Sequence, residues 1–119
     1  MIYILIGIAG ALGAIVRYVV GMYLFTSPYF PYVTLLINLS GSFLLAVLTT
    51  KKLYSATIKL MILTGFLGAF TTFSTFGIEV ILLLQQQRWS LAILYTLISL
   101  VGGLFLVWLG YNNKEVNER

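Results

Sequence analysis

The chain offers few side chains for acid–base or metal chemistry, and mainly hydroxyls, amides and aromatic rings remain. It has no Cys and no His, which removes thiolate nucleophiles, zinc–cysteine sites and the commonest general base. Its only carboxylates are Glu79, Glu115 and Glu118, and the last two lie in a polar C-terminal stretch. We therefore expect a protein that is not an enzyme.

The densest group of small and hydroxyl-bearing residues lies in residues 65–77. This segment holds three glycines and the four hydroxyls of Thr71, Thr72, Ser74 and Thr75. Glycine is a poor helix former, and Ser and Thr side chains can hydrogen-bond their own backbone instead. The segment predicts either a helix broken at membrane depth around Gly68–Thr71, whose freed carbonyls are hard ligands for a cation, or an intact helix with hydroxyls bonded back one turn.

Two phenylalanines stand within this hydroxyl group. Phe73 and Phe76 are three residues apart and share a helix face, while Thr72, Thr75 and Glu79 share the neighbouring one. A phenyl ring carries partial positive charge at its edge, so two edges beside hydroxyl donors can solvate a small anion without a fixed charge. Ordinary core packing of the two rings is the alternative interpretation.

Three further polar residues lie deep in apolar stretches. Asn38, in the Asn38–Ser42 segment, needs hydrogen-bond partners and either lines a polar path or joins two helices. Arg17 and Glu79 fall at similar depths towards the same membrane side, which indicates an ion pair or a charged vestibule. Snorkelling of the Arg17 side chain to lipid headgroups is the alternative.

The amino-acid composition indicates what kind of structure must position these polar residues. Hydrophobic residues make up 61% of the 119 residues and charged residues 8%, with a mean hydropathy of +1.04. Soluble proteins have about 45–50% and about 25% respectively. So small a chain has too little interior to bury this much apolar surface, which excludes a water-soluble enzyme or binding module. The sequence predicts an integral membrane protein.

The apolar runs are long and do not alternate, which is typical of transmembrane helices. We expect residues 1–119 to form a single all-α membrane domain, with spans at 2–25, 33–50, 56–84 and 89–111 and a polar tail at 112–119. The first run also resembles a signal peptide, but its glycines favour a retained helix. Gly7, Gly10, Gly13 and Gly21 predict close packing of this helix against another.

Four spans place both termini and the connection between the second and third spans on one side. That side holds five positive residues and the other side one or two, Arg88 and Arg17, which predicts cytoplasmic termini. The five are Lys51, Lys52, Lys59, Lys114 and Arg119.

Three motifs together carry a resemblance to a known family. They are Gly13-Ala14-Ile15-Val16-Arg17-Tyr18, Asn38-Leu39-Ser40-Gly41-Ser42 and Thr71-Thr72-Phe73-Ser74-Thr75-Phe76. In these motifs, in their order and in its length, the chain resembles the Fluc/CrcB family of fluoride channels over essentially its whole length. The resemblance implies an antiparallel, dual-topology dimer with two pores in a prokaryotic inner or plasma membrane. It implies passive export of cytoplasmic fluoride, which relieves fluoride toxicity.

The resemblance also implies site residues. The implied fluoride pathway comprises Asn38, Phe73, Ser74, Thr75, Phe76, Tyr95 and Ser99. Gly68 and Thr71 match the positions whose main-chain carbonyls hold a structural, untransported Na⁺. Arg17 matches an arginine of the first helix and Glu79 a glutamate of the third helix near the pore mouth, as vestibule or structural charges. The polar track of the fourth helix would continue at Gly103, where the family can have a hydroxyl, so this chain departs from the pattern there.

Two alternatives follow from the charges. The bias of lysine and arginine towards one side fits poorly with insertion in both orientations, so a heterodimer with a homologous subunit stands beside the homodimer. A small multidrug-resistance-type cation/proton antiporter is the competing function, but it would need a carboxylate in the first span, which has Arg17 and no acid. A non-conducting accessory subunit would leave the hydroxyl–phenylalanine cluster unexplained.

Overall fold

The computed structural model describes residues 1–24, 27–52 and 55–117, and side chains as far as Asn113. The described residues form helices only. In chain order they are α1 (Ile2–Tyr23), α2 (Tyr32–Thr50), α3 (Ala56–Leu60), the π-helix η1 (Met61–Leu67), α4 (Gly68–Phe70), α5 (Phe73–Gln85) and α6 (Trp89–Asn117).

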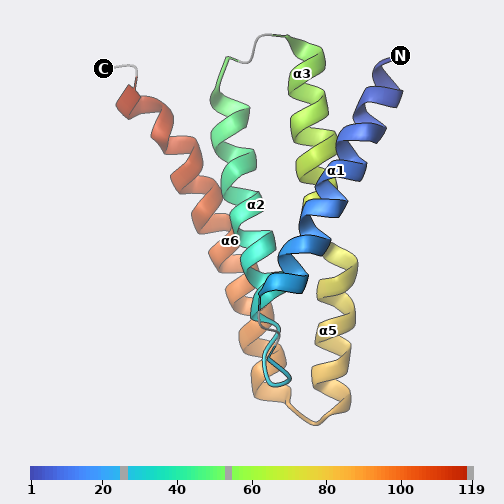
Figure 1. Cartoon of the computed structure of the whole chain (residues 1–119). Coiled ribbons are helices and arrows are strands. Elements are labelled where there is room, and N and C mark those ends of the chain that lie inside the picture. The colour runs from blue at the N-terminus through green and yellow to red at the C-terminus, as the bar shows by residue number, and fades with distance from the viewer. Residues whose placement is uncertain (25–26, 53–54, 118–119) are drawn as a thin grey trace.

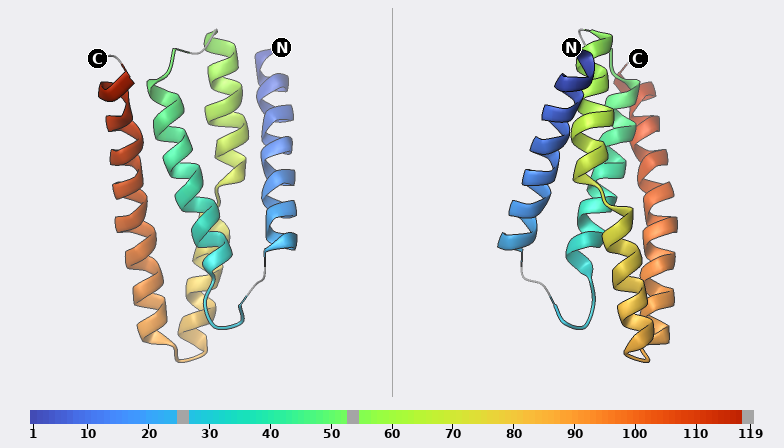
Figure 2. Two further views of the ribbon diagram at one scale, coloured as in Figure 1. Left: turned by 60° about the vertical axis from the view of Figure 1, so that its left-hand side comes forward. Right: turned by 90° about the vertical axis from the view of Figure 1, so that its right-hand side faces the viewer.

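Four helical stretches are long and apolar enough to cross a membrane, which confirms the four-span prediction. They are Ile2–Tyr23, Tyr32–Thr50, Ala56–Gln85 and Trp89–Asn113. The helices run side by side, with the N-terminus and the C-terminal end of α6 at the same end of the molecule (Figures 1 and 2). The turn between α5 and α6 lies at the opposite end.

The ends of the second and third spans differ from the sequence prediction by one residue, and those of the first and fourth by more. Helix α1 ends at Tyr23, with Leu24 in an extended conformation, so the predicted end at residue 25 lies outside the described residues. Helix α6 continues to Asn117, so residues 112–117 of the predicted polar tail extend the helix of the fourth span. Residues 112–117 contain no Gly or Pro, and a helix already formed extends easily into water.

The third span is broken, and the break lies at the C-terminal edge of the predicted region. Gly68–Phe70 remain helical, while Thr71 and Thr72 are extended, with ψ angles of 157° and 121°. The Thr72 hydroxyl then accepts the backbone N–H of Thr75 at 3.2 Å and so caps α5. The glycines weaken this span, but a capping hydroxyl decides where it restarts. The π-helical winding of the first half was not predicted.

The glycines of α1 allow close contact with the π-helix. A Cβ added at Gly13 would overlap the Phe66 carbonyl, and one added at Gly65 would lie 2.6 Å from the Ile6 oxygen. This confirms close packing at Gly10 and Gly13, whereas a Cβ at Gly7 or Gly21 would meet nothing within 4 Å.

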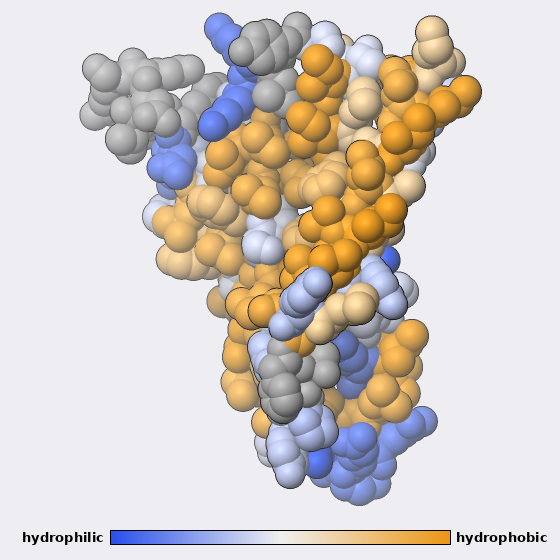
Figure 3. Space-filling view, viewed as in Figure 1, coloured by the Kyte–Doolittle hydropathy of each residue, from blue (hydrophilic) through white to orange (hydrophobic). Residues whose placement is uncertain are grey.

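The interior is small, and most large apolar side chains face outward. One buried cluster joins α2, α5 and α6, and consists of Leu35, Leu83, Ala92 and Tyr95. The face seen in Figure 3 is largely apolar, with hydrophilic residues gathered at its two ends. This distribution suits a protein surrounded by lipid rather than by water.

Candidate functional site

The break in the third span is bound to α2 by one amide side chain. Asn38 donates from Nδ2 to the Thr72 carbonyl at 2.8 Å, and its Oδ1 accepts the Thr72 N–H at 2.8 Å. These bonds replace helical bonds that the extended backbone cannot make. Of the two predicted roles for Asn38, joining two helices is therefore confirmed, and its side chain also lines a cavity described below.

Hydroxyls gather at the start of α5. The Thr72 hydroxyl donates to Thr75 Oγ1 at 3.1 Å and lies 3.3 Å from Ser74 Oγ. Thr72 is buried, while Ser74 and Thr75 are exposed. The cluster thus extends from the break to the protein surface.

Glu79 is held by hydroxyls from two other helices. Thr34 on α2 donates to Oε1 at 2.7 Å, and Tyr95 on α6 donates to Oε2 at 2.7 Å. Tyr95 is fully buried, and its ring packs on Phe76 with centroids 5.1 Å apart. Thr34 was missed by the sequence analysis, although it lies one helical turn before Asn38 and so on the same face of α2.

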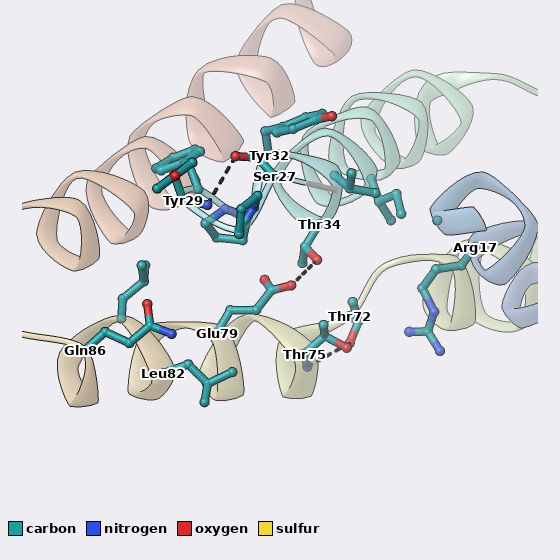
Figure 4. A pocket seen from close by; sticks show the side chains of 17 residues that line it. Arg17, Ser27, Tyr29, Tyr32, Thr34, Thr72, Thr75, Glu79, Leu82 and Gln86 are labelled. Atoms are coloured by element: carbon teal, nitrogen blue, oxygen red, sulfur yellow. Dashed lines mark hydrogen bonds between the residues drawn. The ribbon is translucent and has the colours of Figure 1, made fainter. Parts of the chain in front are cut away.

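A first cavity of about 390 Å³ contains the charged residues (Figure 4). Its polar lining includes Arg17, Thr34, Thr72, Thr75, Glu79 and Gln86, and residues 27–32 form one side. Arg17 donates to the Thr71 carbonyl at 3.4 Å, while the Glu79 oxygens accept hydroxyl groups. Arg17 and Glu79 therefore line the same cavity without a hydrogen bond between them among the described residues, and the Arg17 side chain bonds the helix break.

A second cavity of about 300 Å³ lies on the other side of the break. Asn38, Thr71, Thr72, Phe73, Phe76 and Ser99 line it together with apolar residues. Phe73 and Phe76 have ring centroids 5.8 Å apart with the planes tilted by 39°. Ser99 Oγ is buried and has no hydrogen-bond partner among the described residues. A buried hydroxyl without a partner has an unused donor, which a water molecule or an ion can satisfy.

The structure therefore divides the predicted pathway residues between several positions. Asn38, Phe73, Phe76 and Ser99 line the second cavity, and Thr75 lines the first. Ser74 belongs to the hydroxyl cluster. Tyr95 lines neither cavity, but it donates a hydrogen bond to Glu79 and packs its ring on Phe76. At Gly103, where the polar track of α6 would continue, a Cβ would meet no atom within 4 Å. The structure therefore leaves open space where the family can have a hydroxyl side chain.

The two carbonyls predicted to bind a cation have lost their usual helical partners. In an unbroken helix the Gly68 carbonyl would accept the Thr72 N–H, which here donates to Asn38. The Thr71 carbonyl would accept the Thr75 N–H, which here donates to the Thr72 hydroxyl. The two carbonyls are neutral hard oxygens of the kind that an alkali cation prefers, and the Thr71 oxygen also accepts from the Arg17 guanidinium.

These features together define a small polytopic membrane protein whose polar groups meet where a helix breaks between two cavities. A family model described as "CrcB-like protein, Camphor Resistance (CrcB)" matches residues 4–111, and the chain belongs to this family. The chain is thus a multi-pass protein of the cell membrane and not an enzyme.

Curated relatives cover nearly the whole chain. It is 50% identical to "Fluoride-specific ion channel FluC 1" of Bacillus cereus, over 93% of this chain and 85% of the relative. It is 47% identical to "Fluoride-specific ion channel FluC 1" of Desulfitobacterium hafniense, over 89% and 97%. It is 41% identical to "Fluoride-specific ion channel FluC 2" of Geobacillus kaustophilus, over 93% and 91%.

Proposed function

We propose that this chain forms a fluoride-selective channel that passively exports cytoplasmic fluoride and so relieves its toxicity. One observation carries the proposal: a cavity at membrane depth brings together an Asn38 amide, the unpartnered hydroxyl of Ser99 and the rings of Phe73 and Phe76. Relatives named fluoride-specific ion channels support the choice of ion.

The chemistry of the second cavity suits fluoride. Fluoride is small, strongly hydrated and a strong hydrogen-bond acceptor, so a conducting path must replace its water by several donors. Asn38 uses one Nδ2 hydrogen on Thr72 and has a second available, and Ser99 adds a hydroxyl. Phenyl edges add partial positive charge. None of these groups carries the full charge that would trap the ion.

The first cavity would act as the mouth of this path. Arg17 raises the local concentration of anions, while Glu79, with both oxygens occupied by hydroxyls, keeps the rings of Tyr95 and Phe76 in place. The competing cation/proton antiporter would need a carboxylate in α1, whose only ionisable side chains are Arg17 and tyrosines.

The working unit of the proposal is an antiparallel dimer of two such chains. Phe73 is 84% exposed although it lines the second cavity, so a second subunit is needed to enclose the path there. Gly68, also exposed, lies beside the same cavity. A homodimer is the simpler assembly, and the lysine bias makes a heterodimer the alternative.

Two measurements separate these assemblies. A C-terminal reporter on the chain expressed alone should appear on both membrane sides for a dual-topology homodimer, and on the cytoplasmic side only for an obligate heterodimer. Fluoride efflux from proteoliposomes that contain only this purified chain would refute the obligate heterodimer.

A structural Na⁺ between the subunits is the further part of the proposal. The Gly68 and Thr71 carbonyls of two subunits would supply four neutral oxygens at the point where both helices lack hydrogen bonds. The Thr71 oxygen accepts from Arg17 and keeps a second lone pair. When bound, the ion would tie the subunits together without being conducted.

Gly68→Leu tests the sodium site, because leucine restores helix propensity and adds bulk beside the carbonyls. We expect this variant to lose the increase in thermal stability that Na⁺, compared with a large organic cation, gives the dimer. Gly7→Leu is the matched control, because a Cβ there meets nothing within 4 Å. Equal sodium dependence in both variants would refute the site.

The function itself is tested by ion efflux from proteoliposomes that contain the purified chain. With a potassium gradient and an ionophore to balance charge, a fluoride electrode should record rapid release of fluoride. A chloride electrode under the same gradient should record release no faster than from empty liposomes. Equal release of both ions, or of neither, would refute a fluoride-selective channel.

A further inference from the structure

One wall of the first cavity is a short connecting segment, residues 27–31, which we call the strap. Pro28 and Pro31 restrict its backbone, and Ser27 Oγ accepts the Tyr29 N–H at 3.2 Å. The strap lies over the side of the cavity that contains Glu79 (Figure 4). Its position therefore determines how that side opens to the surroundings.

A single side chain from a distant part of the chain binds the strap. Arg88 Nη1 donates to the Pro28 carbonyl at 3.2 Å and to the Tyr29 carbonyl at 3.5 Å. The same guanidinium lies over the Tyr29 ring, 5.2 Å from its centroid. These are two hydrogen bonds from a charged donor and a cation–π contact on two adjacent residues.

The turn between α5 and α6 fixes the direction of Arg88. The Arg88 N–H donates to the Leu83 carbonyl at 2.9 Å, and the Gln87 N–H donates to the Leu84 carbonyl at 3.0 Å. These two hydrogen bonds form a Schellman motif at the C-terminal end of α5. Gln87 has a φ angle of 60°, a left-handed conformation that usually favours glycine. Arg88 thus stands at a structured helix end and not on a free loop.

The strap also contacts the residues that hold Glu79. The Phe30 ring meets the Tyr95 ring edge to face, with centroids 5.6 Å apart, and Tyr95 donates to Glu79. A change in the strap would therefore reach both the opening of the first cavity and the packing around Phe76.

We propose that Arg88 is a positioning residue that holds the strap over the first cavity and thereby sets access to Glu79. Arginine suits this role because one nitrogen of its guanidinium donates to two carbonyls while the planar face of the same group covers an aromatic ring. A lysine ammonium has no planar face for this stacking. The effect on ion flow rests on the proposed function, whereas the effect on access does not.

Thiol labelling measures access directly, because the chain has no cysteine. Val33 is 7% exposed and lines the first cavity, so Val33→Cys reports on the opening beneath the strap. With a small methanethiosulfonate on both sides of the liposome membrane, we expect Arg88→Ala to speed its labelling by about tenfold, because two charged hydrogen bonds are lost. Arg88→Lys should give an intermediate rate.

Two controls isolate the strap from general loosening. Leu45→Cys lines the second cavity, and its labelling rate should not change with Arg88→Ala. Lys52→Ala removes an exposed cation two residues after the end of α2, and this end of α2 lies away from the turn between α5 and α6 (Figure 1). It should leave the labelling of Val33→Cys unchanged.

If Arg88→Ala does not yield folded protein, Tyr29→Leu removes the cation–π contact while it keeps a large side chain in the cavity wall, and should raise labelling about threefold. Unchanged labelling of Val33→Cys in both variants, or an equal rise at Leu45→Cys, would overturn the proposal. Wild-type protein without fluoride efflux would refute the proposed function, while the labelling result would still decide the role of Arg88.

Discussion

The two cavities share Thr72 as a common wall but differ in the charge of their linings. The first contains Arg17 and Glu79 and opens beside the strap. The second is lined by amide, hydroxyl and aromatic groups, and none of its described lining residues is ionisable. Full charges thus stand at one side of the helix break, and neutral donors at the other.

The difference in charge between the two cavities suggests how a chain with few charged residues can conduct a strongly hydrated anion. A fixed cation attracts an anion from a distance, but at close range in a medium of low dielectric constant it holds the anion too tightly for rapid passage. Separating an attracting mouth from a neutral path meets both needs. The comparison predicts that substitutions in the two cavities act in different ways.

The largest effect should follow from removing the amide that joins α2 to the helix break. Asn38→Leu leaves the Thr72 N–H and carbonyl without partners, at about 1–3 kcal/mol for each buried group. We expect a lower thermal denaturation midpoint in detergent and complete loss of fluoride efflux. Ser40→Ala is the control, because that exposed hydroxyl bonds only the Ile37 carbonyl of its own helix. Equal stability of the two variants would contradict the bridging role.

Removing the cation of the first cavity should slow entry without destroying the path. Arg17→Gln should lower fluoride efflux about tenfold at low ionic strength and by less at high salt. The effect depends on salt because dissolved ions screen the charge of Arg17, and at 0.1 M its attraction for anions extends over only about 10 Å. Efflux measured across a salt series checks this, with Lys52→Gln as the control. A decrease that is independent of salt would place Arg17 in the path itself.

The smallest effect should come from the hydroxyls behind Glu79. Tyr95→Phe loses the bond to Oε2 but keeps the ring against Phe76, so efflux should fall about threefold, less than 1 kcal/mol in the barrier. Thr34→Val loses the bond to Oε1 and leaves the rings untouched, and should change efflux less. A larger decrease of efflux in Thr34→Val than in Tyr95→Phe would contradict this order. It would indicate that Glu79 acts on the ion directly and not by holding the rings of Tyr95 and Phe76 in place.

The sequence predicted the spans, and indicated a break in the third span as one of two alternatives, because both depend on local properties. Apolar run length gives the helices, and Gly65, Gly68 and the hydroxyls at 71–75 give a weak point in the third one. The position of the break at Thr71 and Thr72 depends on Asn38, which lies 34 residues away from Thr72 in the chain. Such a partner cannot be identified from local preferences.

The difference between local preferences and long-range contacts also explains which site residues the sequence did not predict. Thr34 and the strap acquire roles only through tertiary contacts with Glu79, Tyr95 and Arg88. The face shared by Thr72, Thr75 and Glu79 was predicted from helical spacing, and these residues do line one cavity. Helical spacing within α5 places residues correctly, while contacts between helices need the fold.

The central claim is that the neutral second cavity carries the ion, and Phe76→Ile tests it most directly. Phe105→Ile is the matched control, because Phe105 is 54% exposed on α6 and lines neither cavity. Fluoride efflux should fall about 100-fold or more in Phe76→Ile, equivalent to about 3 kcal/mol in the barrier, with the assembly preserved on size exclusion. Phe105→Ile should conduct like the wild type. Wild-type efflux from Phe76→Ile would contradict the account and leave the two phenylalanines as ordinary packing residues.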